Sequence, residues 1–419
     1  MNDLATRLRA SWSVAAIPAA AICAILLTGC GSPPSSLYTI SEPENRQDGL
    51  EVGTLEEVRM DPVPVGRAVD GIGKGKYGEI HSLLIYKDSK LVVEEYFVGH
   101  DYQWDGPDFQ GALVEWGWDT EHNIHSAGKS ITSACVGIAV DRGFIESVDQ
   151  SIFDYLPRHQ HLKTDGKRQI TIEHLLTMTS GLEWDEWRTS YSDERNDVIA
   201  LWMDCEDPVA CILAKPLISE PGTDFTYSGG NSILLGEIVR SATNLDIEAF
   251  AGEYLFSPMG IDPPEWGWIG DSGVVYAAGD QRLTSREMIK FGVAYLNGGV
   301  WNGQRILSEG WIGRSAASYA GPNNSWFNYF LRSIPPGDNT WGQRGYSYAW
   351  WTHEYSHSGS RFPAFWAFGW GGQRIVVFPD QSAVVVLTGG SYVSKDHTAT
   401  ILEEFVLPAF RASRAAVTL

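Results

Sequence analysis

Two pairs of apolar segments, one near each end of the chain, predict β-strands. Residues 82–86 and 91–97 are mostly apolar and are separated by a polar Lys-Asp-Ser-Lys segment that favours a turn, so they predict a β-hairpin. Residues 374–378 and 383–387 are rich in Val and Ile and flank a Pro-Asp-Gln turn. Continuous apolar runs bounded by turn residues are typical of strands buried on both faces.

Between these ends, apolar residues recur at helical spacing. A helix is predicted from about residue 126 to 142, because Ile131, Ala134, Cys135 and Ile138 share one of its faces. Three more helices are predicted, and they cover residues 171–179, the segment after a capping box at 284–287, and residues 397–410.

Strands at both ends and helices in the middle predict an α/β fold. We expect one domain over residues 56–412. Its α/β part would cover about 56–145 and 345–412, interrupted by a mainly helical part at about 146–344.

The first thirty residues predict export. Arg7 and Arg9 precede an apolar run that ends in Leu-Thr-Gly-Cys30, which resembles a bacterial lipobox cleaved before an acylated cysteine. We therefore expect a lipoprotein signal peptide at 1–29, a lipid anchor at Cys30 and a tether over 30–55. The expected location is the periplasm-facing cell envelope, with the outer membrane favoured because Gly31, not Asp, follows the cysteine. An ordinary signal peptide with a chance cysteine is the alternative.

Composition narrows the function classes. The chain is 43% hydrophobic and 20% charged, as in ordinary globular proteins. Its net charge of −21 argues against nucleic acid as a partner, because no basic surplus is present to contact phosphates. Cys205 and Cys211, six residues apart in a chain expected to be exported, predict a local disulfide. Neither cysteine has a partner at zinc-ligand spacing, so no metal site is expected.

The start of the first predicted helix carries candidate chemistry. Ser126 and Lys129 are three residues apart, so they would face the same side of the helix. A lysine on an apolar helix is partly desolvated, which lowers its pKa and lets the neutral amine accept a proton from the serine. This Ser-x-x-Lys pattern is weak on its own.

Further motifs in a fixed order make the pattern specific. The chain resembles the superfamily of serine β-lactamases and penicillin-binding proteins, particularly its class-C-like branch of esterases and 6-aminohexanoate-oligomer hydrolases. The segments that carry the resemblance are Ser126–Lys129 (SAGK), 170–182 (ITIEHLLTMTSGL), Pro221–Asn231 (PGTDFTYSGGN) and Phe368–Gln373 (FGWGGQ). The resemblance covers roughly residues 75–410. It implies an antiparallel sheet built from the two ends of the chain and flanked by helices.

The resemblance also implies the roles of individual residues. Ser126 matches the acylated nucleophile, Lys129 the lysine that accepts its proton, and Tyr227 the tyrosine that relays protons to the leaving group and to water. The backbone N–H groups of Ser126 and Gln373 match the oxyanion hole. Trp370, Gly371 and Gly372 match the substrate-binding strand. No metal and no organic cofactor is implied.

Two departures from the family pattern narrow the expected substrate. The family's Tyr-x-Asn becomes Tyr227-Ser228-Gly229, and its Lys-Thr-Gly becomes Trp370-Gly371-Gly372, so a cation that would pair with a substrate carboxylate is missing. We therefore expect a small ester or amide as substrate. A D-amino-acid peptidase or weak β-lactamase, and a catalytically silent envelope lipoprotein, are the alternatives. Glu173 and Glu183 are candidates for a deacylating base by proximity alone.

Overall fold

The computed structural model describes residues 38–318 and 345–410. They belong to one compact unit of the chain. The predicted signal peptide and the predicted lipidation site Cys30 lie outside the described residues. No helix in the described parts of the chain is long and apolar enough to cross a membrane.

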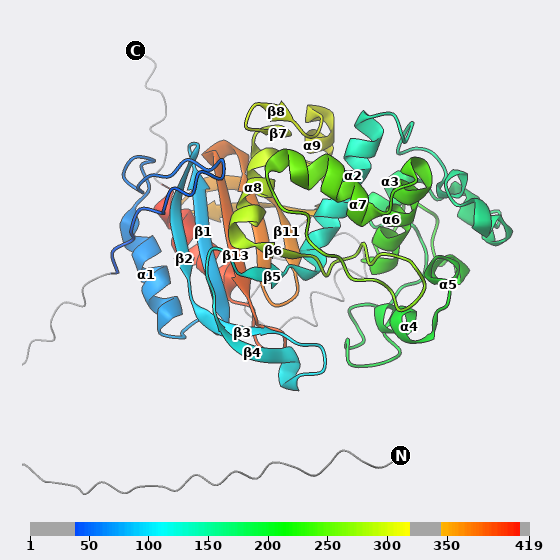
Figure 1. The fold of residues 1–419 in the computed structure, drawn as a ribbon, viewed down its shortest axis with the longest axis horizontal. Coiled ribbons are helices and arrows are strands. Elements are labelled where there is room, and N and C mark those ends of the chain that lie inside the picture. The colour runs from blue at the N-terminus through cyan, green and yellow to red at the C-terminus, as the bar shows by residue number, and fades with distance from the viewer. Residues whose placement is uncertain (1–37, 319–344, 411–419) are drawn as a thin grey trace, which may run out of the picture. The chain divides into compact units, whose positions relative to one another are not determined.

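A seven-stranded antiparallel sheet combines the two ends of the domain (Figure 1). The strand order is β2-β1-β13-β12-β11-β10-β9. The strands are β1 (Ile80–Lys87), β2 (Lys90–Tyr96), β9 (Gly345–Ser347), β10 (Trp350–His357), β11 (Ser360–Gly369), β12 (Gln373–Phe378) and β13 (Ala383–Gly389). The predicted hairpin is present as β1 and β2, and β1 also pairs antiparallel with β13. The predicted fold class is therefore confirmed.

The central strands are apolar throughout because both faces of the sheet are covered. Side chains alternate between the faces of a strand, so Val384 and Val386 belong to one core and Val385 and Leu387 to the other. Helix α8 (Ser285–Leu296) contributes to the first core, with the predicted capping box of Thr284 and Glu287 at its start. Helix α1 (Pro62–Gly73) covers the other face, together with the C-terminal segment of α11 (Thr398–Ile401), a π-helical turn (Leu402–Val406) and α12 (Leu407–Ala409).

The remaining helices lie beside the sheet (Figure 1). Helix α2 (Gly128–Asp141) has all but its last two residues buried, and it packs on α6 (Gly229–Thr243). Shorter helices are α3 (Ile172–Leu176), α4 (Asp197–Asp204), α5 (Pro208–Ala214), α7 (Ile247–Ala251) and α9 (Glu309–Ala316). Three two-stranded ribbons complete the fold: β3 (Val98–Tyr102) with β4 (Gln110–Glu115), β5 (Glu121–Asn123) with β6 (Arg282–Thr284), and β7 (Val300–Trp301) with β8 (Gln304–Arg305).

Three predicted boundaries need correction. The tether predicted over 30–55 is too long, because Leu50 and Leu55 are buried and Val52 forms a bridge with Leu91. The part predicted as helical, 146–344, includes α8, which packs on the sheet. The helix predicted over 171–179 ends at Leu176, because Met178 takes a left-handed backbone conformation with φ of 58°.

Candidate active site

Ser126 lies in a short 3₁₀ turn, His125–Ala127, that leads into α2. The preceding residue, His125, has a left-handed φ of 46°, and its N–H is held by the side-chain oxygen of Asn123 at 2.9 Å. Gly128 follows the turn, and a Cβ there would lie 1.7 Å from the side-chain oxygen of Gln281. The helix predicted from residue 126 therefore begins two residues later, and the tight turn in front of it presents the serine.

The amine of Lys129 is directed at the serine. Its Nζ lies 2.9 Å from Ser126 Oγ and 2.8 Å from the carbonyl oxygen of Ala278. The side chain is only 1% exposed. Burial lowers the pKa of Lys129, and the nearby carboxylate of Glu186 opposes that shift. The spacing argument from the sequence thus corresponds to a direct contact between these two side chains.

Glu186 is a part of the site that the sequence did not reveal. Its Oε1 lies 3.7 Å from Lys129 Nζ, and its side chain is also 1% exposed. The carboxylate accepts hydrogen bonds from Trp184 Nε1 at 2.8 Å, from the Tyr191 hydroxyl at 3.0 Å and from the backbone N–H of Gly229. With these donors in place, the buried charge is both paired and hydrogen-bonded.

The two glutamates suggested by sequence proximity lie elsewhere. Glu173 accepts a hydrogen bond from the Tyr348 hydroxyl at 2.7 Å, and Glu183 is exposed. Neither lines the cavity at Ser126. The loop around Glu186 has no regular periodicity, so only the fold shows which of its acidic side chains turns inward.

Tyr227 lies just before the start of α6, and its ring contacts the site formed by Ser126 and Lys129. Its ring centroid lies 4.9 Å from Lys129 Nζ, and its ring packs against Trp187 with centroids 4.4 Å apart. Burial and the charge of Glu186 raise the pKa of Tyr227, while a hydrogen bond with Ser126 lowers it. The net shift keeps the side chain a neutral phenol. The three predicted catalytic side chains therefore lie together.

The strand predicted to bind substrate also comes close to the nucleophile turn. A Cβ on Gly369, the last residue of β11, would lie 2.0 Å from the carbonyl oxygen of Ile124. Trp370 lines the same cavity as Ser126, whereas Gly371 and Gly372 form the turn before β12, both with positive φ. The side chain of Gln373 is bonded to the Trp370 carbonyl at 3.2 Å. The roles of the Ser126 and Gln373 N–H groups as an oxyanion hole stay predictions.

The asparagine closest in sequence to the family's missing one does not face the site. Asn231 is fully buried in α6, and its amide nitrogen is directed at the sulfur of Met178 at 3.6 Å. Ser228, which occupies the middle of the altered Tyr-x-Asn pattern, caps α6 by accepting from the N–H of Asn231. Both side chains therefore belong to the start of α6, directly after Tyr227 in the chain.

A cavity of about 360 Å³ opens at Ser126. Helix α4 forms one wall with Val198, Ile199, Trp202 and Met203. His125 also lines the cavity, so this neighbour of the nucleophile faces the space where a substrate would bind. By contrast, His174 is structural, since its ring accepts from the N–H of Thr171 and closes a capping box on α3.

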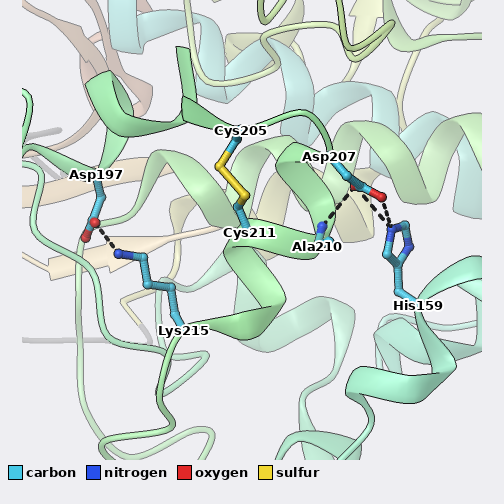
Figure 2. Close-up of a disulfide and its surroundings, with 7 residues drawn as sticks. All are labelled: His159, Asp197, Cys205, Asp207, Ala210, Cys211 and Lys215. Carbon is cyan, nitrogen blue, oxygen red and sulfur yellow. Dashed lines mark hydrogen bonds and ion pairs between the residues drawn. A yellow bond between two sulfur atoms is a disulfide. The ribbon is translucent and has the colours of Figure 1, made fainter. Parts of the chain in front are cut away.

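Helix α4 is fixed at both ends (Figure 2). At its start, Asp197 forms an ion pair with Lys215, and Asn196 donates to the carbonyl oxygen of Glu186 at 3.0 Å. At its end, Cys205 is disulfide-bonded to Cys211 of α5. The pairing expected from the sequence is therefore present, and it anchors a wall of the cavity.

Comparison with known proteins places this geometry in a family. A profile of the Beta-lactamase family matches residues 81–403. The chain is 26% identical over 200 residues to 6-aminohexanoate-dimer hydrolase of Paenarthrobacter ureafaciens, covering 46% of this chain and 50% of the relative. It is 27% identical over 151 residues to Esterase EstB of Burkholderia gladioli, covering 34% and 38%. The matched segments thus span half or less of these two relatives.

Solved structures share the fold over a longer stretch. A family VIII carboxylesterase superposes with a TM-score of 0.58 at 17% identity and covers 82% of this chain and 96% of its own. A penicillin-binding protein from Bacillus halodurans gives a TM-score of 0.57 at 16% identity, with 80% and 98% covered. At such identities the likeness concerns the fold alone. Because the family profile spans most of the sequence and the fold agrees, the chain belongs to the Beta-lactamase family.

Proposed function

We propose that this chain hydrolyses a carboxylic ester or a small amide through an acyl-enzyme on Ser126. The observation that carries the proposal is the contact between Ser126 Oγ and Lys129 Nζ at 2.9 Å, with the ring of Tyr227 centred 4.9 Å from the same nitrogen. A nucleophile, a base and a proton relay are the parts that covalent acyl transfer needs.

Acylation begins with proton transfer. The neutral amine of Lys129 takes the proton of Ser126, and Oγ attacks the carbonyl carbon of the substrate. The negative charge that develops on the carbonyl oxygen is stabilised by backbone N–H groups, for which Ser126 and Gln373 are our candidates. The carbonyl is restored when the bond to the leaving group breaks, and Tyr227 donates a proton to the departing alcohol or amine. Lys129 then returns its proton to Tyr227.

Deacylation reverses these roles. A water molecule gives its proton to the neutral amine of Lys129 while its oxygen attacks the acyl carbon. The bond to Ser126 Oγ breaks and the serine regains a proton, so the carboxylic acid leaves and the enzyme is restored. The carboxylate of Glu186, 3.7 Å from Lys129 Nζ, stabilises the ammonium that Lys129 becomes.

Two features favour an ester or simple amide over a β-lactam or a D-amino-acid peptide. Trp370 occupies the position of the family's cationic lysine, and the amide of Asn231 is turned toward Met178. A substrate carboxylate would thus lack its cation, and the amide of such a substrate would lack the asparagine that holds it. The names of the hydrolase and esterase relatives agree with this choice.

The test uses wild type and Ser126→Ala. We expect wild type to hydrolyse short-chain p-nitrophenyl esters and to be labelled by a fluorophosphonate probe, with both signals lost in the variant. Nitrocefin turnover tests the β-lactamase alternative. Folded wild-type protein that neither reacts with the probe nor cleaves any ester would contradict the proposal and favour a silent scaffold.

We also propose that the chain is exported and anchored through an acylated Cys30. The disulfide between Cys205 and Cys211 supports export, because such bonds persist in oxidising compartments. Full-length protein expressed in a bacterial host with an alkyne fatty acid should become labelled and membrane-associated. Cys30→Ala should abolish the label, and labelling that survives this change would refute the anchor.

A further inference from the structure

The cavity at Ser126 has an unusual lining. Six of its lining side chains are aromatic, and they come from different segments of the chain: Tyr102, Trp104, Tyr191, Trp202, Tyr276 and Trp370. One acid, Asp280, lies among them. Of the described residues that line the cavity, none is Lys or Arg. Aromatic faces attract cations through their quadrupole, and a carboxylate adds a full opposite charge.

Asp280 lies beside the reacting serine. It is two residues beyond Ala278, whose carbonyl oxygen holds Lys129 at 2.8 Å. The residue between them, Gly279, packs on the nucleophile turn so closely that a Cβ there would lie 3.3 Å from the backbone nitrogen of Ser126. A group bound at Asp280 would thus share one cavity with a carbonyl placed at Ser126.

The charge of Asp280 has little compensation within the protein. Its partners are the neutral amide of Asn123 and the more distant Arg282, which is itself paired with Asp101 at 3.1 Å. Burial raises the pKa of Asp280, and these two partners counter that only in part. His125 supplies no positive charge, because burial, Arg282 and Lys129 together lower its pKa to about 3. A cationic ligand would therefore improve the environment of this carboxylate.

Two other charged side chains near Ser126, those of Lys129 and Glu186, could compete for a charged ligand, but each already has partners within the protein. Lys129 is held by Ser126, Ala278 and Glu186, and Glu186 accepts bonds from Trp184, Tyr191 and Gly229. The net charge of −21 adds a field that attracts cations and repels anions.

We infer that the substrate carries an alkylammonium group, which the aromatic side chains and Asp280 bind while Ser126 attacks the ester or amide. This inference rests on the proposed hydrolase function and names the class of its substrate. The cation can belong to the leaving group or to the acyl group, since both would approach Ser126 from this cavity.

Pairs of isosteric substrates test the inference, because carbon replaces charged nitrogen with little change in shape. For a cationic leaving group the pair is acetylthiocholine and S-(3,3-dimethylbutyl) thioacetate. For a cationic acyl group it is the p-nitrophenyl esters of 4-(trimethylammonio)butanoic acid and 5,5-dimethylhexanoic acid. We expect kcat/KM to favour the cation about tenfold in at least one pair. The pair that shows the preference identifies the side of the scissile bond.

Asp280→Asn removes the charge and keeps the shape. We expect the ratio of kcat/KM for the charged and neutral members of the pair to fall about tenfold toward unity in this variant. Asp271→Asn is the matched control, because Asp271 is exposed in the same loop region and does not line the cavity. The inference would be overturned if wild type hydrolysed the charged and neutral members of both pairs with equal kcat/KM. It would also be overturned if Asp280→Asn left the ratio of the two kcat/KM values unchanged.

Binding without turnover separates this inference from the proposed function. Choline and the neutral 3,3-dimethylbutan-1-ol are titrated into Ser126→Ala by calorimetry. We expect choline to bind more tightly than the alcohol, and Asp280→Asn in the same background to remove the difference. No preference for choline would overturn the inference while ester hydrolysis by wild type upholds the proposed function. If wild type bound choline but hydrolysed no ester, the cation site would be upheld and the proposed hydrolase function contradicted.

Discussion

The carboxylate of Glu186 lies 3.7 Å from the amine nitrogen of Lys129, and both side chains are almost completely buried. The charge of Glu186 raises the pKa of both groups that move protons. For Lys129, Glu186 opposes the lowering of the pKa that burial causes. For Tyr227, Glu186 adds to the rise in pKa that burial causes. Because burial leaves the pKa of Lys129 lowered and burial and Glu186 together raise that of Tyr227, Lys129 is favoured as the base that activates Ser126 and Tyr227 as a phenol that donates.

Glu186→Gln tests this electrostatic role through the pH profile. The active form needs neutral Lys129, so the rate should rise with pH as Lys129 loses its proton. Glu186 raises the pKa of Lys129, so its removal should move this rise to lower pH. The plateau kcat should fall, because the ammonium formed during acylation loses its partner. Log kcat measured against pH reports both effects.

Glu183→Gln is the control for that experiment, since Glu183 is exposed and lies three residues away. Its pH profile should match wild type. A thermal melt of each variant separates loss of charge from loss of fold. A Glu186→Gln enzyme that folds normally and keeps the wild-type profile would contradict the assigned role.

Tyr227→Phe should remove the proton relay and keep the packing. The ring is held by Trp187 and Trp351, with centroids 4.4 Å and 6.1 Å away, and these contacts do not need the hydroxyl. We expect kcat for an ester to fall by about 10²–10⁴ with little change in melting temperature. Tyr295→Phe, in the core on α8, should keep wild-type activity. Full activity of Tyr227→Phe would exclude the hydroxyl from the mechanism.

The disulfide should stabilise the domain and one wall of the cavity. Closing a loop between Cys205 and Cys211 contributes about 2 kcal/mol by the chain-entropy model. The double variant Cys205→Ser/Cys211→Ser should lose about that much unfolding free energy, measured in urea. It should also raise KM for esters with bulky apolar groups, because Trp202 and Met203 lie in the helix that ends at Cys205. Reductant should have the same effect on wild type and none on the double variant.

The sequence predicted the parts of the site that depend on local spacing or on ordered motifs. Ser126 and Lys129 are one turn apart, and the apolar runs of β12 and β13 mark a strand pair covered on both faces. Glu186 and Asp280 could not be found in this way. Each lies in an irregular segment, and its direction depends on contacts with residues far away in the chain, such as Gly229 for Glu186 and Asn123 for Asp280.

The close approach of β11 to the nucleophile turn gives a last prediction. A Cβ on Gly369 would lie 2.0 Å from the carbonyl oxygen of Ile124. Because both groups belong to the backbone, an added methyl group would force one of the two segments to move. Gly369→Ala should cost about 1–3 kcal/mol of stability, as overpacking in a core does. Because the displaced atoms are the turn that holds Ser126 and the strand end before Trp370, kcat/KM should fall even at temperatures where the variant is fully folded. Gly313→Ala is the control, since nothing lies within 4 Å of a Cβ at that exposed position in α9. It should leave activity unchanged and increase stability by about 0.5–1 kcal/mol. A Gly369→Ala enzyme with wild-type turnover would show that the strand can move away without affecting catalysis, and that its proximity to Ser126 is not needed for the reaction.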